Sequence, residues 1–161
     1  MKTLTNQLKI IFDYSMKTLG QIFDYPSEAW SSGAPPIWNH FFHTLMGTEF
    51  WIRENYDAPF AFSLKLPEKY APLYKEEWFP EKFEAPDIAI AREYFDTISA
   101  NADKVFSALT DETLGKKPWQ SVDLSNIEII NGQIRHIMYH AGMIAQSLES
   151  AGFDELPWIG Y

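Results

Sequence analysis

The sequence contains no cysteine, and this absence removes several kinds of chemistry. Disulfide frameworks, thiolate metal sites, catalytic cysteines and thiol redox switches all need a cysteine side chain. Any thiol that takes part in the chemistry of this protein therefore comes from another molecule. A chain of 161 residues can hold a hydrophobic core without disulfides, as cytosolic proteins commonly do.

Long uncharged apolar runs and an excess of positive charge are also missing. No stretch of about 18 apolar residues is free of charge, as a membrane-spanning helix would require. The 13 basic and 22 acidic residues give a net charge of −9, which repels phosphate backbones and anionic lipid surfaces. The first residues carry Lys9, Asp13 and Lys17 among apolar positions, so we expect no signal peptide. We therefore expect a cytoplasmic protein that binds neither nucleic acid nor membranes.

Sustained alternation of apolar and polar residues is missing as well, and the apolar residues instead recur every three or four positions. This spacing predicts amphipathic helices. The proline pair at residues 35–36 is expected to open the second helix, and Asp87 to cap the third. Ser125 and Glu128 form a capping box before the fourth helix, which Gly152 closes. The four expected helices cover residues 4–23, 36–56, 88–109 and 127–148.

A proline-rich and aromatic segment separates the second expected helix from the third. Residues 57–86 hold five of the ten prolines and seven aromatic residues, so a long regular element cannot run through them. We expect an ordered crossover anchored by its rings, which either covers one side of the molecule or caps a site. The chain is thus predicted to be all-α, a four-helix bundle with a long crossover, and a single domain of residues 1–161.

All four histidines lie in two of the expected helices, His40 and His43 in the second and His136 and His140 in the fourth. Residues four apart point the same way on a helix, so the last two can offer two imidazoles to one ion. For a single histidine, a buried neutral ring hydrogen bonded to an oxygen is the more common arrangement. A third imidazole on a facing helix favours a metal site instead, because bundles bind metals with side chains from facing helices.

Three imidazoles and a water would make an open, catalytic-type site suited to Zn, Ni, Fe or Mn. Considered from the residues alone, His40 and His43 are nearly equivalent as the third ligand. Gly47 lies one turn after His43 and leaves room beside it, but this does not decide between the two.

Other polar groups near the histidines are weaker candidates. Asn39 and Gln133 could orient an imidazole, since a metal-bound histidine usually donates its second nitrogen to a polar partner. Glu49 lies six residues after His43, so it points elsewhere, and we expect it to make a contact rather than to be a ligand. Tyr139 is about 100° around its helix from the next histidine, and we expect it to pack.

The sequences around the histidines resemble the DinB-like superfamily, which is named for DNA-damage-inducible proteins. In that family the second helix carries a histidine, a short apolar stretch, an acid and an aromatic pair, and residues 43–51 (HTLMGTEFW) are similar. The family's fourth helix ends in His-x-x-x-His-x-Gly-Gln-aliphatic, and residues 136–144 (HIMYHAGMI) are similar, with Met143 in place of the glutamine.

The resemblance implies a four-helix bundle in which His43, His136 and His140 bind a divalent metal ion. It leaves His40 as an extra histidine, either beside the ligands or in packing. Some similar proteins are transferases that use a low-molecular-weight thiol such as bacillithiol or mycothiol, and others resemble hydrolases or isomerases. The implied function is a metal-dependent enzyme that activates a thiol or water against a small substrate. The alternative is a non-catalytic bundle that binds a metal or ligand in a stress response.

The resemblance also implies a homodimer, because homodimers are common among similar proteins. The last residues offer apolar area for such an interface. Equally, they could fold back on their own helices. The apolar tail residues are Phe153, Leu156, Trp158, Ile159 and Tyr161.

Overall fold

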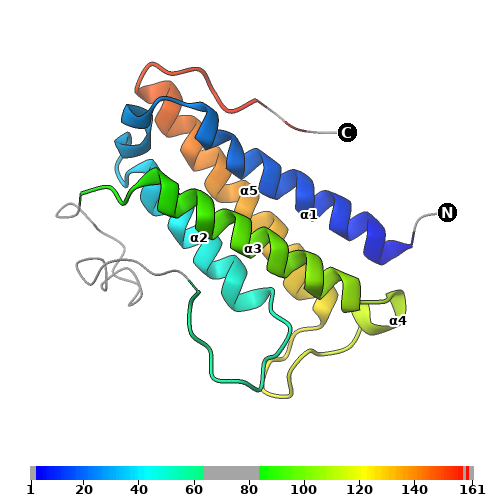
Figure 1. Cartoon of the computed structure of the whole chain (residues 1–161). Helices are drawn as coiled ribbons and strands as arrows, with labels where there is room; N and C mark the ends of the chain where they lie inside the picture. Colours follow the sequence, from blue (N-terminus) through cyan, green and yellow to red (C-terminus); the bar gives the residue numbers. More distant parts are fainter. Residues whose placement is uncertain (1–2, 64–83, 158, 160–161) are drawn as a thin grey trace.

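A computed structural model gives the fold of the chain, and it describes residues 3–63, 84–157 and 159. Every regular element in these residues is a helix, which confirms the predicted all-α class (Figure 1). The elements are α1 (Leu4–Gly20), η1 (Gln21–Asp24), η2 (Ser27–Ser31), α2 (Ile37–Trp51), α3 (Ile88–Ala108), α4 (Asp111–Leu114) and α5 (Asn126–Ser150), where η marks a 3-10 helix. None of the described helices has both the length and the apolar character that crossing a membrane requires.

The long helices α1, α2, α3 and α5 lie alongside one another (Figure 1). α5 packs against α1 and α2, and α3 packs against the same two helices. Each long helix contributes to one core, because Phe12, Phe41, Ile98 and Ile137 are all at most 1% exposed. The core therefore runs between the helices, and side chains on the facing sides of α2 and α5 are brought close together.

The caps that the sequence predicts are present at both ends of α5 and at the start of α3. Asp87 accepts a hydrogen bond from the backbone N–H of Ala89. Ser125 and Glu128 form the reciprocal capping box. Gly152 follows α5 with a φ of 83°, a left-handed conformation that glycine adopts without strain. These caps fix where α5 begins and ends, and hence how its histidines are placed along the core.

The second predicted helix ends earlier than the sequence pattern indicates. α2 begins at Ile37, as expected, but stops at Trp51 rather than near residue 56. The side-chain oxygen of Asn55 accepts hydrogen bonds from the backbone N–H groups of Asp57 and Ala58. Asparagine offers the backbone this local turn in competition with helix, so the chain leaves the helical path. α1 likewise ends at Gly20, and η1 continues it as a tighter turn.

The predicted crossover is described only at its ends, because residues 64–83 lie outside the described residues. Its first part, 57–63, is irregular and anchored by rings, as Phe60 contacts Phe50 and Phe62 with centroid separations of 5.1 and 4.8 Å. Between α3 and α5 the chain forms one further helical turn, α4, which Thr110 caps.

The described part of the C-terminal tail lies on its own helices. Leu156 is buried, and Phe153 packs against the core. The Tyr25 hydroxyl donates a hydrogen bond to the backbone oxygen of Glu155 at 2.8 Å. Trp158 and Tyr161 lie outside the described residues.

Candidate metal centre

Three histidines from α2 and α5 converge on one centre. One ring nitrogen from each of His43, His136 and His140 lies within 4.8 Å of the other two. The three rings are almost equally spaced, with centroid separations of 4.8, 4.8 and 4.7 Å. The predicted proximity of these residues is therefore confirmed, while metal binding stays a prediction.

The closest approach in the cluster is between the Nε2 atoms of His43 and His136, which are 2.9 Å apart. At this distance the two nitrogens form a hydrogen bond, in which one donates its proton and the other accepts it. A metal ion bound at this centre would replace that proton, because both nitrogens would then offer a lone pair.

Gly47 allows His136 to come this close to α2. A Cβ atom at Gly47 would lie 2.8 Å from Cε1 and 3.2 Å from Nδ1 of the His136 ring. Real Cβ atoms essentially never approach another heavy atom within 3.0 Å, so any larger residue would move the ring. The room that the sequence indicates beside His43 is thus filled by an imidazole from α5.

His40 lies behind the cluster and contacts one of its members. Its Nδ1 is 3.3 Å from Nδ1 of His140, and the residue is only 4% exposed. In such a pair one nitrogen donates and the other accepts. A proton on Nδ1 of His140 leaves the lone pair of its Nε2 available to an ion. The structure therefore distinguishes the two histidines of α2, because His43 belongs to the cluster and His40 lies beside His140.

Burial keeps all four imidazoles neutral near pH 7. Burial lowers the pKa of His43 to about 3, helped by the neighbouring His136, His140 and His40. The pKa of His140 falls to about 4, first through burial and then through His136 and His40. Burial also lowers the pKa values of His40 and His136. Neutral rings have the lone pairs that a metal ion requires.

The predicted orienting role of Asn39 and Gln133 is not seen. Their side-chain oxygens are buried and accept no hydrogen bond from the described residues, and Nδ1 of His136 also has no partner. Helix position alone could not reveal this, because it depends on the side-chain rotamers.

Glu49 makes a contact rather than joining the histidines, as expected. Its carboxylate accepts a hydrogen bond from the Tyr94 hydroxyl at 2.5 Å and another from the backbone N–H of Ser63 at 2.8 Å. The packing role expected for Tyr139 is largely wrong, because this residue is 65% exposed. Its ring contacts the His140 ring, with the two centroids 5.2 Å apart. Its position beyond the edge of the core stripe turns it to solvent.

The donor set fits a divalent transition metal ion. Three neutral imidazoles are borderline-soft nitrogen donors, which suit Zn, Ni and Fe better than Mn, Mg or Ca. No carboxylate of the described residues belongs to the cluster. A bound ion would therefore keep its full positive charge.

Comparisons with known protein families, with curated proteins and with solved structures gave no match for this chain. The DinB-like resemblance consequently rests on residues 43–51 and 136–144 and stays a prediction.

Proposed function

We propose that this protein is a metal-dependent enzyme whose His43, His136 and His140 bind a divalent transition metal ion. The observation that carries the proposal is the convergence of three neutral imidazoles from two helices. In this proposal α1, α2, α3 and α5 form a four-helix bundle of the DinB-like kind, in which α2 and α5 present the ligands.

An ion held by three neutral ligands lowers the pKa of a bound water or thiol toward neutrality, which makes a nucleophile for transfer to, or hydrolysis of, a small substrate. The protein supplies no thiol of its own, because it has no cysteine. A thiol nucleophile is therefore a second small molecule, such as a low-molecular-weight thiol. The three histidines leave at least one coordination position for it.

The remaining residues of the site hold the imidazoles in place. Gly47 gives the His136 ring its space. Nδ1 of His40 lies 3.3 Å from Nδ1 of His140, where it can accept the proton of that nitrogen and so leave Nε2 for the ion. Such partners of metal-bound histidines typically contribute tenfold to a hundredfold to metal affinity. We therefore expect His40→Phe to bind metal less tightly than His40→Gln, whose side-chain oxygen still accepts a proton.

Metal analysis of the purified protein tests the proposal. We expect one ion per chain in the wild type and at least a hundredfold weaker binding in each of the alanine variants of His43, His136 and His140. Tyr139→Ala is the matched control, because this residue neighbours His140 but is exposed. Equal metal content in the wild type and the histidine variants would end the proposal.

A non-catalytic metal- or ligand-binding protein is the second candidate. The absence of a carboxylate from the cluster, within the described residues, favours it, because many metal-dependent hydrolases use a carboxylate as general base. A thiol-conjugation assay separates the two functions, with bacillithiol, glutathione and mycothiol offered to a panel of electrophiles. Turnover that disappears on chelation and returns with metal supports the enzyme, whereas a fully loaded and inactive protein supports the alternative.

A further inference from the structure

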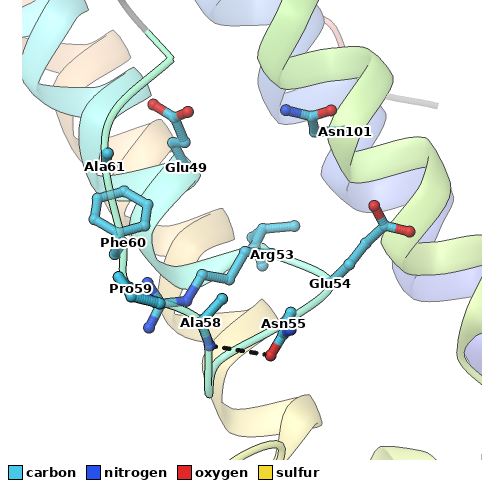
Figure 2. A pocket seen from close by; sticks show the side chains of 10 residues that line it. Glu49, Arg53, Glu54, Asn55, Ala58, Pro59, Phe60, Ala61 and Asn101 are labelled. Atoms are coloured by element: carbon cyan, nitrogen blue, oxygen red, sulfur yellow. Dashed lines mark hydrogen bonds between the residues drawn. The ribbon is translucent and has the colours of Figure 1, made fainter.

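A second candidate site lies past the end of α2, where the chain turns into the loop that follows the helix. A cavity of about 210 Å³ lies here. Figure 2 shows side chains from this loop around it, with Asn101 of α3 across from them. Arg53 and Phe60 line it, and Glu49 and Glu54 also contribute. No histidine is among the lining residues, so this cavity is separate from the metal centre.

Arg53 is a half-buried cation, and two of its three guanidinium nitrogens lack an acceptor. Its guanidinium carbon lies 4.8 Å from the centroid of Phe50, 4.7 Å from that of Tyr56 and 4.8 Å from that of Phe60. Rings attract a cation but contribute no in-plane lone pair to its N–H groups. Nε and Nη1 of Arg53 are buried and donate no hydrogen bond to the described residues. Buried charged donors of this kind are costly unless an acceptor reaches them.

The nearby glutamates do not satisfy this arginine. Both oxygens of Glu49 are already hydrogen bonded, one to the Tyr94 hydroxyl and one to the backbone N–H of Ser63. Glu54 is exposed and makes no ion pair with Arg53 in the described structure. The acceptor that Arg53 lacks is therefore not supplied by either carboxylate at the cavity.

The rim of the cavity is held by hydrogen bonds of its own. The side-chain oxygen of Asn55 accepts from the backbone N–H groups of Asp57 and Ala58 at 2.9 and 3.2 Å (Figure 2). The hydroxyl of Tyr56 donates to the backbone oxygen of Trp51. The loop is thus held in shape by hydrogen bonds in which Arg53 takes no part.

We propose that this cavity binds a small organic carboxylate, and that the Arg53 guanidinium turns toward the cavity on binding so that its N–H groups donate to both carboxylate oxygens. The planar fork of arginine matches a carboxylate with two parallel hydrogen bonds. A singly charged carboxylate is also repelled less by Glu49 and Glu54 than a phosphate dianion is. The volume is below the roughly 300 to 1,000 Å³ of drug-sized ligand sites, so the acid is small.

The chain offers a direct readout, because it contains only three arginines, Arg53, Arg92 and Arg135. The metal-free protein is first freed of chelator. The Nε–H signals of these residues are then followed by NMR during titration with acetate, propionate or benzoate at constant ionic strength. We expect the Nε–H signal of Arg53 to shift until it saturates, while the signals of the other two arginines stay in place. The Arg53 signal is the one that is absent from the spectrum of Arg53→Lys. The variants Arg92→Lys and Arg135→Lys identify the same signal by elimination, so the test does not depend on the folding of Arg53→Lys.

Affinities complete the test. We expect Arg53→Lys to bind the best of these acids at least tenfold more weakly than the wild type. Arg92→Lys should bind as the wild type does, because Arg92 lies over Phe23, at 4.2 Å, and not in the cavity. The proposal is overturned if no acid shifts the Arg53 signal, if Arg53→Lys binds equally well, or if inorganic phosphate binds as tightly as the carboxylates. None of these outcomes depends on the metal centre, so the two proposals fail separately.

Discussion

At the scale of single residues, Gly47 is the position on which the geometry of the histidine cluster most directly depends. Alanine at this site would place its Cβ 2.8 Å from Cε1 of His136. We expect Gly47→Ala to push the ring out of the cluster and to weaken metal binding about tenfold or more. This loss should appear although alanine favours a helix over glycine by roughly 0.5 to 1 kcal/mol. Competition with a chromophoric chelator measures the affinity.

Gly142 provides the matched control on the other helix of the cluster. A Cβ atom there would meet nothing within 4 Å. Gly142→Ala should therefore raise the free energy of unfolding by about 0.5 to 1 kcal/mol and leave metal affinity unchanged. Wild-type affinity in Gly47→Ala, or an equal loss in both variants, would contradict the role assigned to Gly47.

The sequence predicted which histidines meet but not how they meet. The spacing of His136 and His140 places both on one helix face, and a histidine on a facing helix follows from the expected bundle. The spacing could not choose between His40 and His43, because helical periodicity gives the faces of α2 but not its rotation and height relative to α5. The resemblance to a family pointed to His43, which the structure places in the cluster.

At the scale of elements, the hydrogen bond between Glu49 and Tyr94 joins α2 to α3. The Tyr94 side chain is buried, and its hydroxyl donates to a carboxylate oxygen that is also buried. We expect Tyr94→Phe to lower the free energy of unfolding by about 1 to 3 kcal/mol, because the carboxylate loses a donor that water does not replace. Urea denaturation followed by circular dichroism measures the loss.

Tyr139→Phe is the control for this substitution, since it removes the same hydroxyl from a residue that is 65% exposed. Its free energy of unfolding should stay within about 0.5 kcal/mol of the wild type. Equal effects of the two substitutions would show that the contact between α2 and α3 contributes nothing of its own.

The elements that could be predicted from sequence are those with both a cap and a long apolar stripe. α3 and α5 start where Asp87 and Ser125 predict. The end of α2 could not be predicted, because residues 52–56 continue the helical pattern while Asn55 forms a local turn instead. Arg53 thereby leaves the expected helix for the loop, and the cavity around it has no signal in the sequence.

At the scale of the whole molecule, composition predicted the class of fold correctly and the partners only as hypotheses. The absence of alternating segments indicated helices, and the described residues form no strand. The net charge of −9 still argues against nucleic acid and anionic membranes as partners. A homodimer and a cytoplasmic location stay predictions, since neither follows from the fold of one chain.

The gathering of all four histidines in one core makes the stability of the whole molecule sensitive to mild acid. Their pKa values are below the ordinary 6.5 in the folded protein, with His43 at about 3 and His140 at about 4. Below pH 6.5 the unfolded chain therefore binds more protons than the folded one, so the free energy of unfolding falls as pH falls. Above that pH both states are neutral at these rings, and the effect disappears.

For the metal-free protein we expect a loss of roughly 1 to 2 kcal/mol between pH 7 and pH 5, a figure reduced for the partial contact of the rings with solvent. Urea denaturation at each pH measures it. The carboxylates of Asp111, Asp123 and Glu128, whose pKa values are lowered by hydrogen bonds, act only at more acidic pH and do not enter this window. The double variant with His43→Gln and His140→Gln is the control, and its free energy of unfolding should change much less between pH 7 and pH 5. Equal stability of the wild type at pH 7 and pH 5 would mean that the rings accept protons in place, and the buried neutral cluster on which metal binding depends would then be wrong.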